Sequence, residues 1–155
     1  MKFFLGLESS GAAGSKWQIM VNVLEPIFNA HFEDKEYPFL ENIGIISVIM
    51  QDEFIDGYPE RVYFSRKKKF FDVRLHIPYK AFCCSKGIER RRLYAAHVIT
   101  SLKAFESRMK TKEEKAALCE IIGIADEILQ TWLSTKDEHD DTVSLLPLAK
   151  PIGKM

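Results

Sequence analysis

The fold is decided by the stretch Arg61-Val-Tyr-Phe-Ser-Arg-Lys-Lys-Lys-Phe-Phe-Asp-Val-Arg-Leu-His-Ile-Pro78. On both sides of its basic centre, apolar and polar residues alternate, which is the period of a β-strand with one buried face. The two halves therefore predict an antiparallel hairpin with its turn near Lys67 and Lys68. A hairpin with one apolar face needs a covering layer, and the rest of the chain supplies that layer as helices.

Two further strands are predicted before the hairpin. Lys2 to Leu7 reads as a short, largely buried strand, and Ile43 to Met50 is apolar except for Ser47. The second run is short and rich in β-branched residues, so it predicts a central strand covered on both faces or nearly so.

Three amphipathic helices complete the chain. Apolar residues recur every three to four positions after Lys16 and again between Gly87 and Lys110. Pro26 lies inside the first pattern and predicts a kink or a break there. Thr111 followed by Glu114 matches a capping box, which predicts the start of the third helix.

The predicted order of elements is β-α-β-β-β-α-α. Three consecutive strands favour an antiparallel meander, so we expect an α+β fold in which an antiparallel sheet of about four strands has its helices packed on one face. We expect a single domain over residues 1–135, followed by an acidic stretch and a loosely held tail over residues 136–155.

Charge is distributed unevenly along the chain, although the formal net charge is zero. Residues 1–56 contain 3 basic and 9 acidic residues, residues 57–110 contain 14 and 4, and residues 111–155 contain 5 and 9. A basic centre between acidic flanks fits an anionic partner, and it fits equally well opposite charges that neutralise each other within the fold.

Composition points to a cytoplasmic protein without a metal or cofactor. The three cysteines, two of them adjacent, match neither a disulfide framework nor a metal-binding spacing. The start of the chain, Met1 to Leu7, has an apolar run of only about five residues before Gly6 or Glu8 breaks it, which is too short for a signal peptide. No run approaches the roughly 18 apolar residues of a membrane span.

The polar residues could serve catalysis or nucleic-acid binding. Asp72, Arg74 and His76 share one face of a predicted strand and contain the groups needed for acid–base catalysis. However, any half-buried strand presents such a face, so we favour a structural or partner-binding role and expect no catalytic residue. The basic clusters Arg66 to Lys69 and Arg90 to Arg92 support an alternative function, a small nucleic-acid-binding module.

The overall pattern resembles the immunity protein 44 family of bacterial polymorphic-toxin and contact-dependent growth inhibition systems. The resemblance covers roughly residues 1 to 110. Its most specific part is the lysine-rich hairpin with the strand Asp72-Val-Arg-Leu-His-Ile-Pro-Tyr79, followed by the arginine-rich helix that contains Ser101 and Leu102.

This resemblance implies a function without catalysis. Proteins of the family are expected to bind a cognate secreted toxin domain, commonly a nuclease, in the cytoplasm and to neutralise it. An inhibitor of a basic nuclease usually offers carboxylates to the cleft that holds phosphate. We therefore expect toxin contacts from one acidic loop (Asp52, Glu53, Asp56 and Glu60) and then a second (Glu33, Asp34 and Glu36); the alternative surface is a polar strand face (Arg61, Tyr63, Asp72, Arg74 and His76).

Overall fold

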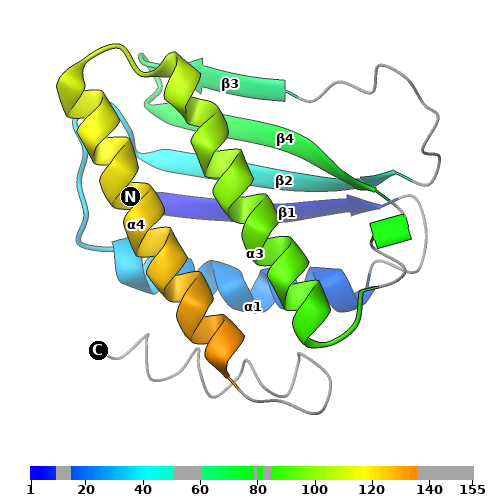
Figure 1. Ribbon diagram of the computed structural model, residues 1–155. Coiled ribbons are helices and arrows are strands. Elements are labelled where there is room, and N and C mark those ends of the chain that lie inside the picture. Colours follow the sequence, from blue (N-terminus) through cyan, green and yellow to red (C-terminus); the bar gives the residue numbers. More distant parts are fainter. Residues whose placement is uncertain (10–14, 51–60, 79, 82–84, 136–155) are drawn as a thin grey trace.

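The computed structural model describes residues 1–9, 15–50, 61–78, 80–81 and 85–135. In it, three α-helices and a short 3-10 helix pack on one face of a four-stranded sheet (Figure 1). The elements are β1 (Lys2–Ser9), α1 (Ser15–Phe32), β2 (Asn42–Met50), β3 (Arg61–Ser65), β4 (Phe70–Pro78), α3 (Ile88–Lys103), η2 (Ala104–Arg108) and α4 (Lys112–Ser134). The predicted α+β class and element order are confirmed.

The sheet is mixed, so the prediction of a purely antiparallel meander was wrong. Its strand order is β1-β2-β4-β3; β1 and β2 are parallel, β2 and β4 are parallel, and only β3 and β4 are antiparallel. The crossing helix α1 makes β1 and β2 parallel, as in a βαβ unit. β3 lies at the edge of the sheet, and β4 rather than β3 pairs with β2.

Helix boundaries differ from the predictions in two places. Pro26 does not break α1, which continues through it to Phe32. The helix predicted from Gly87 to Lys110 ends earlier, because η2 follows α3 at Ala104. The capping box is confirmed: the Glu114 N–H donates to the Thr111 side chain at 3.1 Å, and Glu114 accepts from the Thr111 N–H.

Aromatic side chains fill the space between the sheet and the helices. Phe71 of β4 stacks on Phe105 of η2 with 4.1 Å between ring centroids, and Phe3 of β1 lies 5.1 Å from Phe28 of α1. All four side chains are fully buried. Alternate strand residues thus face the helices, and the residues between them form the opposite face of the sheet.

Both edges of the sheet hydrogen-bond to side chains of the helical layer. On β1, the Phe3 N–H donates to the Asn29 side chain at 2.7 Å, and the Leu5 N–H donates to Glu25 at 3.0 Å. On β3, the Arg108 guanidinium donates to the Val62 carbonyl at 3.0 Å. Exposed strand edges invite pairing with other chains, and these contacts protect the edges against it.

Candidate functional site

The sheet presents one face that none of the described helices covers, which we call the open face (Figure 1). It consists of the residues that alternate with the core positions on the four strands. They are Lys2, Phe4, Gly6 and Glu8 of β1; Asn42, Gly44, Ile46, Val48 and Met50 of β2; Arg61, Tyr63 and Ser65 of β3; and Phe70, Asp72, Arg74, His76 and Pro78 of β4.

The strand register brings the five residues of the predicted polar strand face together. Arg61 lies opposite Arg74, and Tyr63 lies opposite Asp72, on the antiparallel pair β3 and β4. His76 follows on the same side of β4, where Val48 is its partner in β2. Tyr63 is 46% exposed, and its ring centroid lies 6.4 Å from that of Phe70.

The Asp72 carboxylate lies over the backbone of β2. A Cβ atom built on Gly44 would be only 2.8 Å from the Asp72 Oδ1 atom, so the glycine leaves the space that this carboxylate occupies. Partial burial raises the pKa of Asp72, although the nearby positive charges of Arg61 and Arg74 act in the opposite direction. Asp72 is therefore a partly desolvated carboxylate whose two arginine neighbours do not fully compensate for its burial.

An ion pair crosses the same face. The Arg74 guanidinium forms a salt bridge with Glu8 of β1, across the intervening strand β2. The positive charge of Arg74 thus acts on two carboxylates, because it also lowers the pKa of Asp72. Sequence reasoning missed Glu8, since its partner is distant in sequence and only the strand order brings the two together.

The acidic loop of Asp52, Glu53, Asp56 and Glu60 lies outside the described residues. Its anchors are described: it leaves the end of β2 and enters β3 at Arg61. The second acidic candidates, Glu33, Asp34 and Glu36, are exposed and follow α1 directly.

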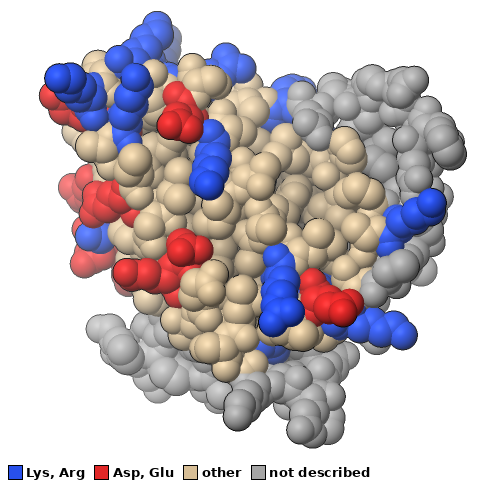
Figure 2. Space-filling view, viewed as in Figure 1, with Lys and Arg blue, Asp and Glu red and all other residues tan. Residues whose placement is uncertain are grey.

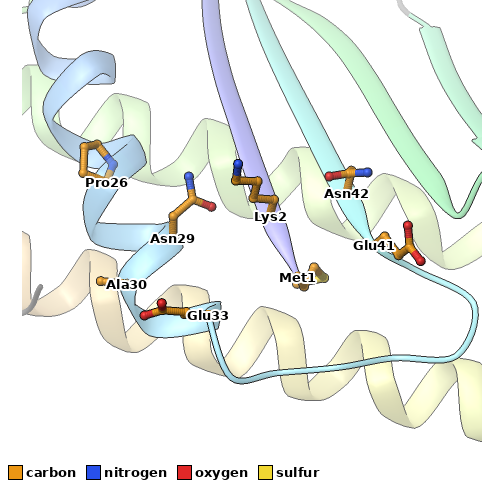
Figure 3. Close-up of a pocket in the computed structure, with 8 residues that line it drawn as sticks. All are labelled: Met1, Lys2, Pro26, Asn29, Ala30, Glu33, Glu41 and Asn42. Atoms are coloured by element: carbon orange, nitrogen blue, oxygen red, sulfur yellow. The ribbon is translucent and has the colours of Figure 1, made fainter.

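Glu33 also lines a hollow of about 570 Å³ beside the beginning of β1 (Figure 3). The hollow is lined by Met1, Lys2, Pro26, Asn29, Ala30, Glu33, Glu41 and Asn42. Its carboxylates, Glu33 and Glu41, come from different segments, and Lys2 lies on the strand between them (Figure 3). Within the hollow, the Asn29 side chain is already bonded to the backbone of Phe3.

The predicted basic clusters are partly used within the fold. Arg66 binds Glu114 through both terminal guanidinium nitrogens. Arg91 is buried and donates to the carbonyls of Trp132 and Thr135 at 3.2 and 3.0 Å. On the helix side, Lys and Arg side chains are interspersed with Asp and Glu rather than gathered in one patch (Figure 2). These contacts leave fewer cations for nucleic acid than the sequence suggested.

A groove of about 490 Å³ separates α3 from α4 on the side away from the sheet. Its apolar lining includes Ile99, Leu118 and Ile122, and its charged lining contains both signs, so it favours no particular ligand. Within the described residues, no group of three His, Cys, Asp or Glu side chains is placed to hold a metal ion. None of the described helices is long and apolar enough to cross a membrane.

Comparison with known proteins gives one match. The model of a family described as Immunity protein 44 matches residues 1–125. No curated protein and no solved structure matches the chain. The matched residues include all four strands and extend into α4.

Proposed function

The chain belongs to the immunity protein 44 family, and we propose from this that it binds a cognate secreted toxin domain in the bacterial cytoplasm and neutralises it. Neutralisation is by occupation of the toxin surface, without a chemical step. The family match carries this proposal, because it spans residues 1–125 and so includes the entire sheet.

The described surface is compatible with a role in protein binding. The open face combines aromatic side chains, arginines and carboxylates on four hydrogen-bonded strands. Tyrosine and arginine are enriched where protein interfaces gain most of their binding energy. A sheet also holds these side chains at fixed spacings, which lowers the entropy lost when a partner binds.

We propose that the toxin is a nuclease. A nuclease needs cationic groups to hold phosphate, and an inhibitor that carries carboxylates is drawn to the same groups. The acidic loop between β2 and β3 contains Asp52, Glu53, Asp56 and Glu60 and no basic residue. Replacing Asp52, Glu53 and Asp56 by lysine should slow association with such a toxin, most strongly at low ionic strength.

Co-expression tests the proposed function. The probe is the toxin domain encoded next to this chain's gene, induced in a bacterial host with or without the chain. We expect survival only with the chain, and we expect the two proteins to co-purify. An immunity protein of a different family is the control for specificity. Cell death in the presence of well-expressed, folded chain contradicts the proposal.

A further inference from the structure

Two aromatic side chains of the open face are widely exposed. Phe4 of β1 is 47% exposed and Tyr63 of β3 is 46% exposed, and no other large apolar or aromatic side chain in the described part of the chain is more exposed. The Tyr63 ring lies beside Phe70 of β4, with 6.4 Å between the ring centroids. Phe4 and Tyr63 belong to one row across the four strands, so they lie about 14 Å apart at a strand spacing of about 4.8 Å. The face therefore offers flat apolar groups at both edges of the sheet.

The formal charge of the open face is positive. Its charged residues are three cations and two carboxylates, namely Lys2, Arg61, Arg74, Glu8 and Asp72. The turn that joins β3 to β4 (Figure 1) adds Lys67, Lys68 and Lys69, which we call the lysine turn. A carboxylate of Glu41 lies 3.8 Å from the Lys69 ammonium. Lys67 and Lys68 are exposed, and neither forms an ion pair with another described residue, so both remain available to an anionic ligand.

The backbone holds the lysine turn in place at one end of the sheet. The Lys69 carbonyl accepts hydrogen bonds from the N–H groups of Glu41 and Asn42 at 2.7 and 3.2 Å. The turn directly precedes Phe70, whose ring lies beside that of Tyr63. Cations and aromatic rings are thus neighbours on a fixed framework, which lowers the entropy lost when a ligand binds.

This combination of groups matches the chemistry of a single-stranded nucleic acid. Proteins bind such strands by stacking bases on aromatic rings and by holding phosphates with lysine and arginine. A double helix does not expose the faces of its bases, so the aromatic side chains favour a single strand. Asp72 lies between Phe4 and Tyr63 in the row, and its carboxylate can accept a hydrogen bond from a ribose hydroxyl, which DNA lacks. The arrangement therefore favours RNA over DNA.

We propose that the open face binds a short single strand of RNA, with bases stacked on Phe4 and Tyr63 and phosphates held by the lysine turn. This binding is additional to toxin binding and does not depend on it. An acidic protein surface also matches the lysines, but its carboxylates are repelled by Asp72 between the two rings. A nucleotide presents its uncharged base and ribose there and keeps its phosphate on the side of the lysine turn.

Fluorescence anisotropy with the purified chain tests this site. The probe is a labelled RNA of about ten nucleotides, of mixed sequence and unable to pair with itself. DNA of the same sequence and the duplex of the RNA with its complement are measured beside it. We expect the chain to bind the single-stranded RNA most tightly, and we expect the affinity to fall steeply as salt is added.

Replacing the aromatic side chains should weaken RNA binding. Tyr63→Ala and Phe4→Ala should each raise the dissociation constant at least about fivefold, because the stacking of one base is lost. Tyr63→Phe keeps the ring and should bind RNA like the wild type. Ile88→Ala, at a side chain that is 41% exposed on the helical layer, is the control and should leave binding unchanged. Melting curves check that each variant is folded.

Replacing the lysines should reduce the salt dependence of binding. For Lys67→Gln combined with Lys68→Gln, each phosphate contact that is lost should lower the slope of log affinity against log salt by about 0.7. The control combines Lys112→Gln with Lys115→Gln, at two exposed lysines of α4, and should leave the slope unchanged.

Several results overturn the inference without touching the proposed function. They are no RNA binding at about 100 µM chain and low salt, an affinity for DNA or the duplex as high as for the RNA, or equal losses in the open-face and control variants. If the chain binds no RNA but Tyr63→Ala loses affinity for the toxin domain from the neighbouring gene, the open face is a protein-docking surface instead. The co-expression assay tests toxin neutralisation separately.

Discussion

We expect Glu114 to stabilise the packing of the β3–β4 hairpin against α4 in a pH-dependent manner. Its Oε1 atom accepts from Arg66 at 3.0 Å and from the Lys110 N–H at 2.8 Å, and its Oε2 atom pairs with the second nitrogen of Arg66. These contacts, the Arg66 hydrogen bond foremost, lower the pKa of Glu114 from 4.5 to about 2. The carboxylate should therefore stabilise the folded state, and Glu114→Gln should remove that contribution.

The size of the effect follows from the pKa. A decrease from 4.5 to about 2 corresponds to an upper limit of about 3 kcal/mol at neutral pH. The Arg66 side chain is 39% exposed, so water screens the pair and we expect Glu114→Gln to lower the free energy of unfolding by about 1.5–2 kcal/mol at pH 7. Because the folded pKa is depressed, this stabilisation is present above about pH 4.5 and is lost as the pH falls towards 2.

Urea unfolding followed by circular dichroism, at pH 7 and at about pH 3, measures this prediction. Glu113→Gln is the control, since Glu113 is an exposed carboxylate in the same helical turn. The difference between wild type and Glu114→Gln should shrink to less than half at about pH 3. A loss of unfolding free energy that is equal at both pH values, or no larger than the loss in Glu113→Gln, refutes this role of Glu114.

Three further predictions concern stability. Gly123→Ala should raise the free energy of unfolding by about 0.5–1 kcal/mol, measured by urea unfolding, because alanine favours the helix and its Cβ meets no neighbour; a loss of stability contradicts this. Asn29→Ala should cost about 1–3 kcal/mol and promote self-association in size-exclusion chromatography, because it leaves the backbone of Phe3 without these side-chain hydrogen bonds. Unchanged elution and stability, as expected for the control Gln18→Ala, which removes an exposed hydrogen bond to Asn22, would count against edge protection. Burial lowers the pKa of His97 from 6.5 to about 4, so the unfolded chain takes up a proton at a higher pH than the folded chain does. The free energy of unfolding should therefore fall as the pH drops from 6.5 to about 4. His97→Gln should reduce this dependence of stability on pH, and an unchanged dependence would show that other groups cause it.

Most of the strands and helices could be predicted from the sequence, because alternation and helical periodicity are local signals. The alternation of Val62 and Phe64 with Tyr63 was enough to predict β3. The capping box of Thr111 and Glu114 predicted the beginning of α4. The strand order was not accessible in this way, because pairing of β2 with β4 depends on where β3 lies in the sheet.

The same limit applies to the site. The polar residues of β3 and β4 were identified from alternation, since neighbouring strands of a hairpin share a register. Phe4, Glu8 and Gly44 were missed, because they join the open face only through the parallel pairing of β1, β2 and β4. The hydrogen bonds of Arg91 were also missed, since their acceptors, the Trp132 and Thr135 carbonyls, lie at the end of α4, about forty residues away in the chain.

A stoichiometric inhibition assay tests the central claim most directly. The purified chain is added in increasing amounts to a fixed concentration of the active toxin domain from the neighbouring gene, well above the dissociation constant, and residual toxin activity is measured. Neutralisation by binding predicts a linear fall in activity that reaches its end at a fixed molar ratio, with active toxin recovered after the complex is denatured and the toxin refolded. Complete inhibition by a small catalytic amount of the chain, or undiminished activity with the chain in excess, would contradict it.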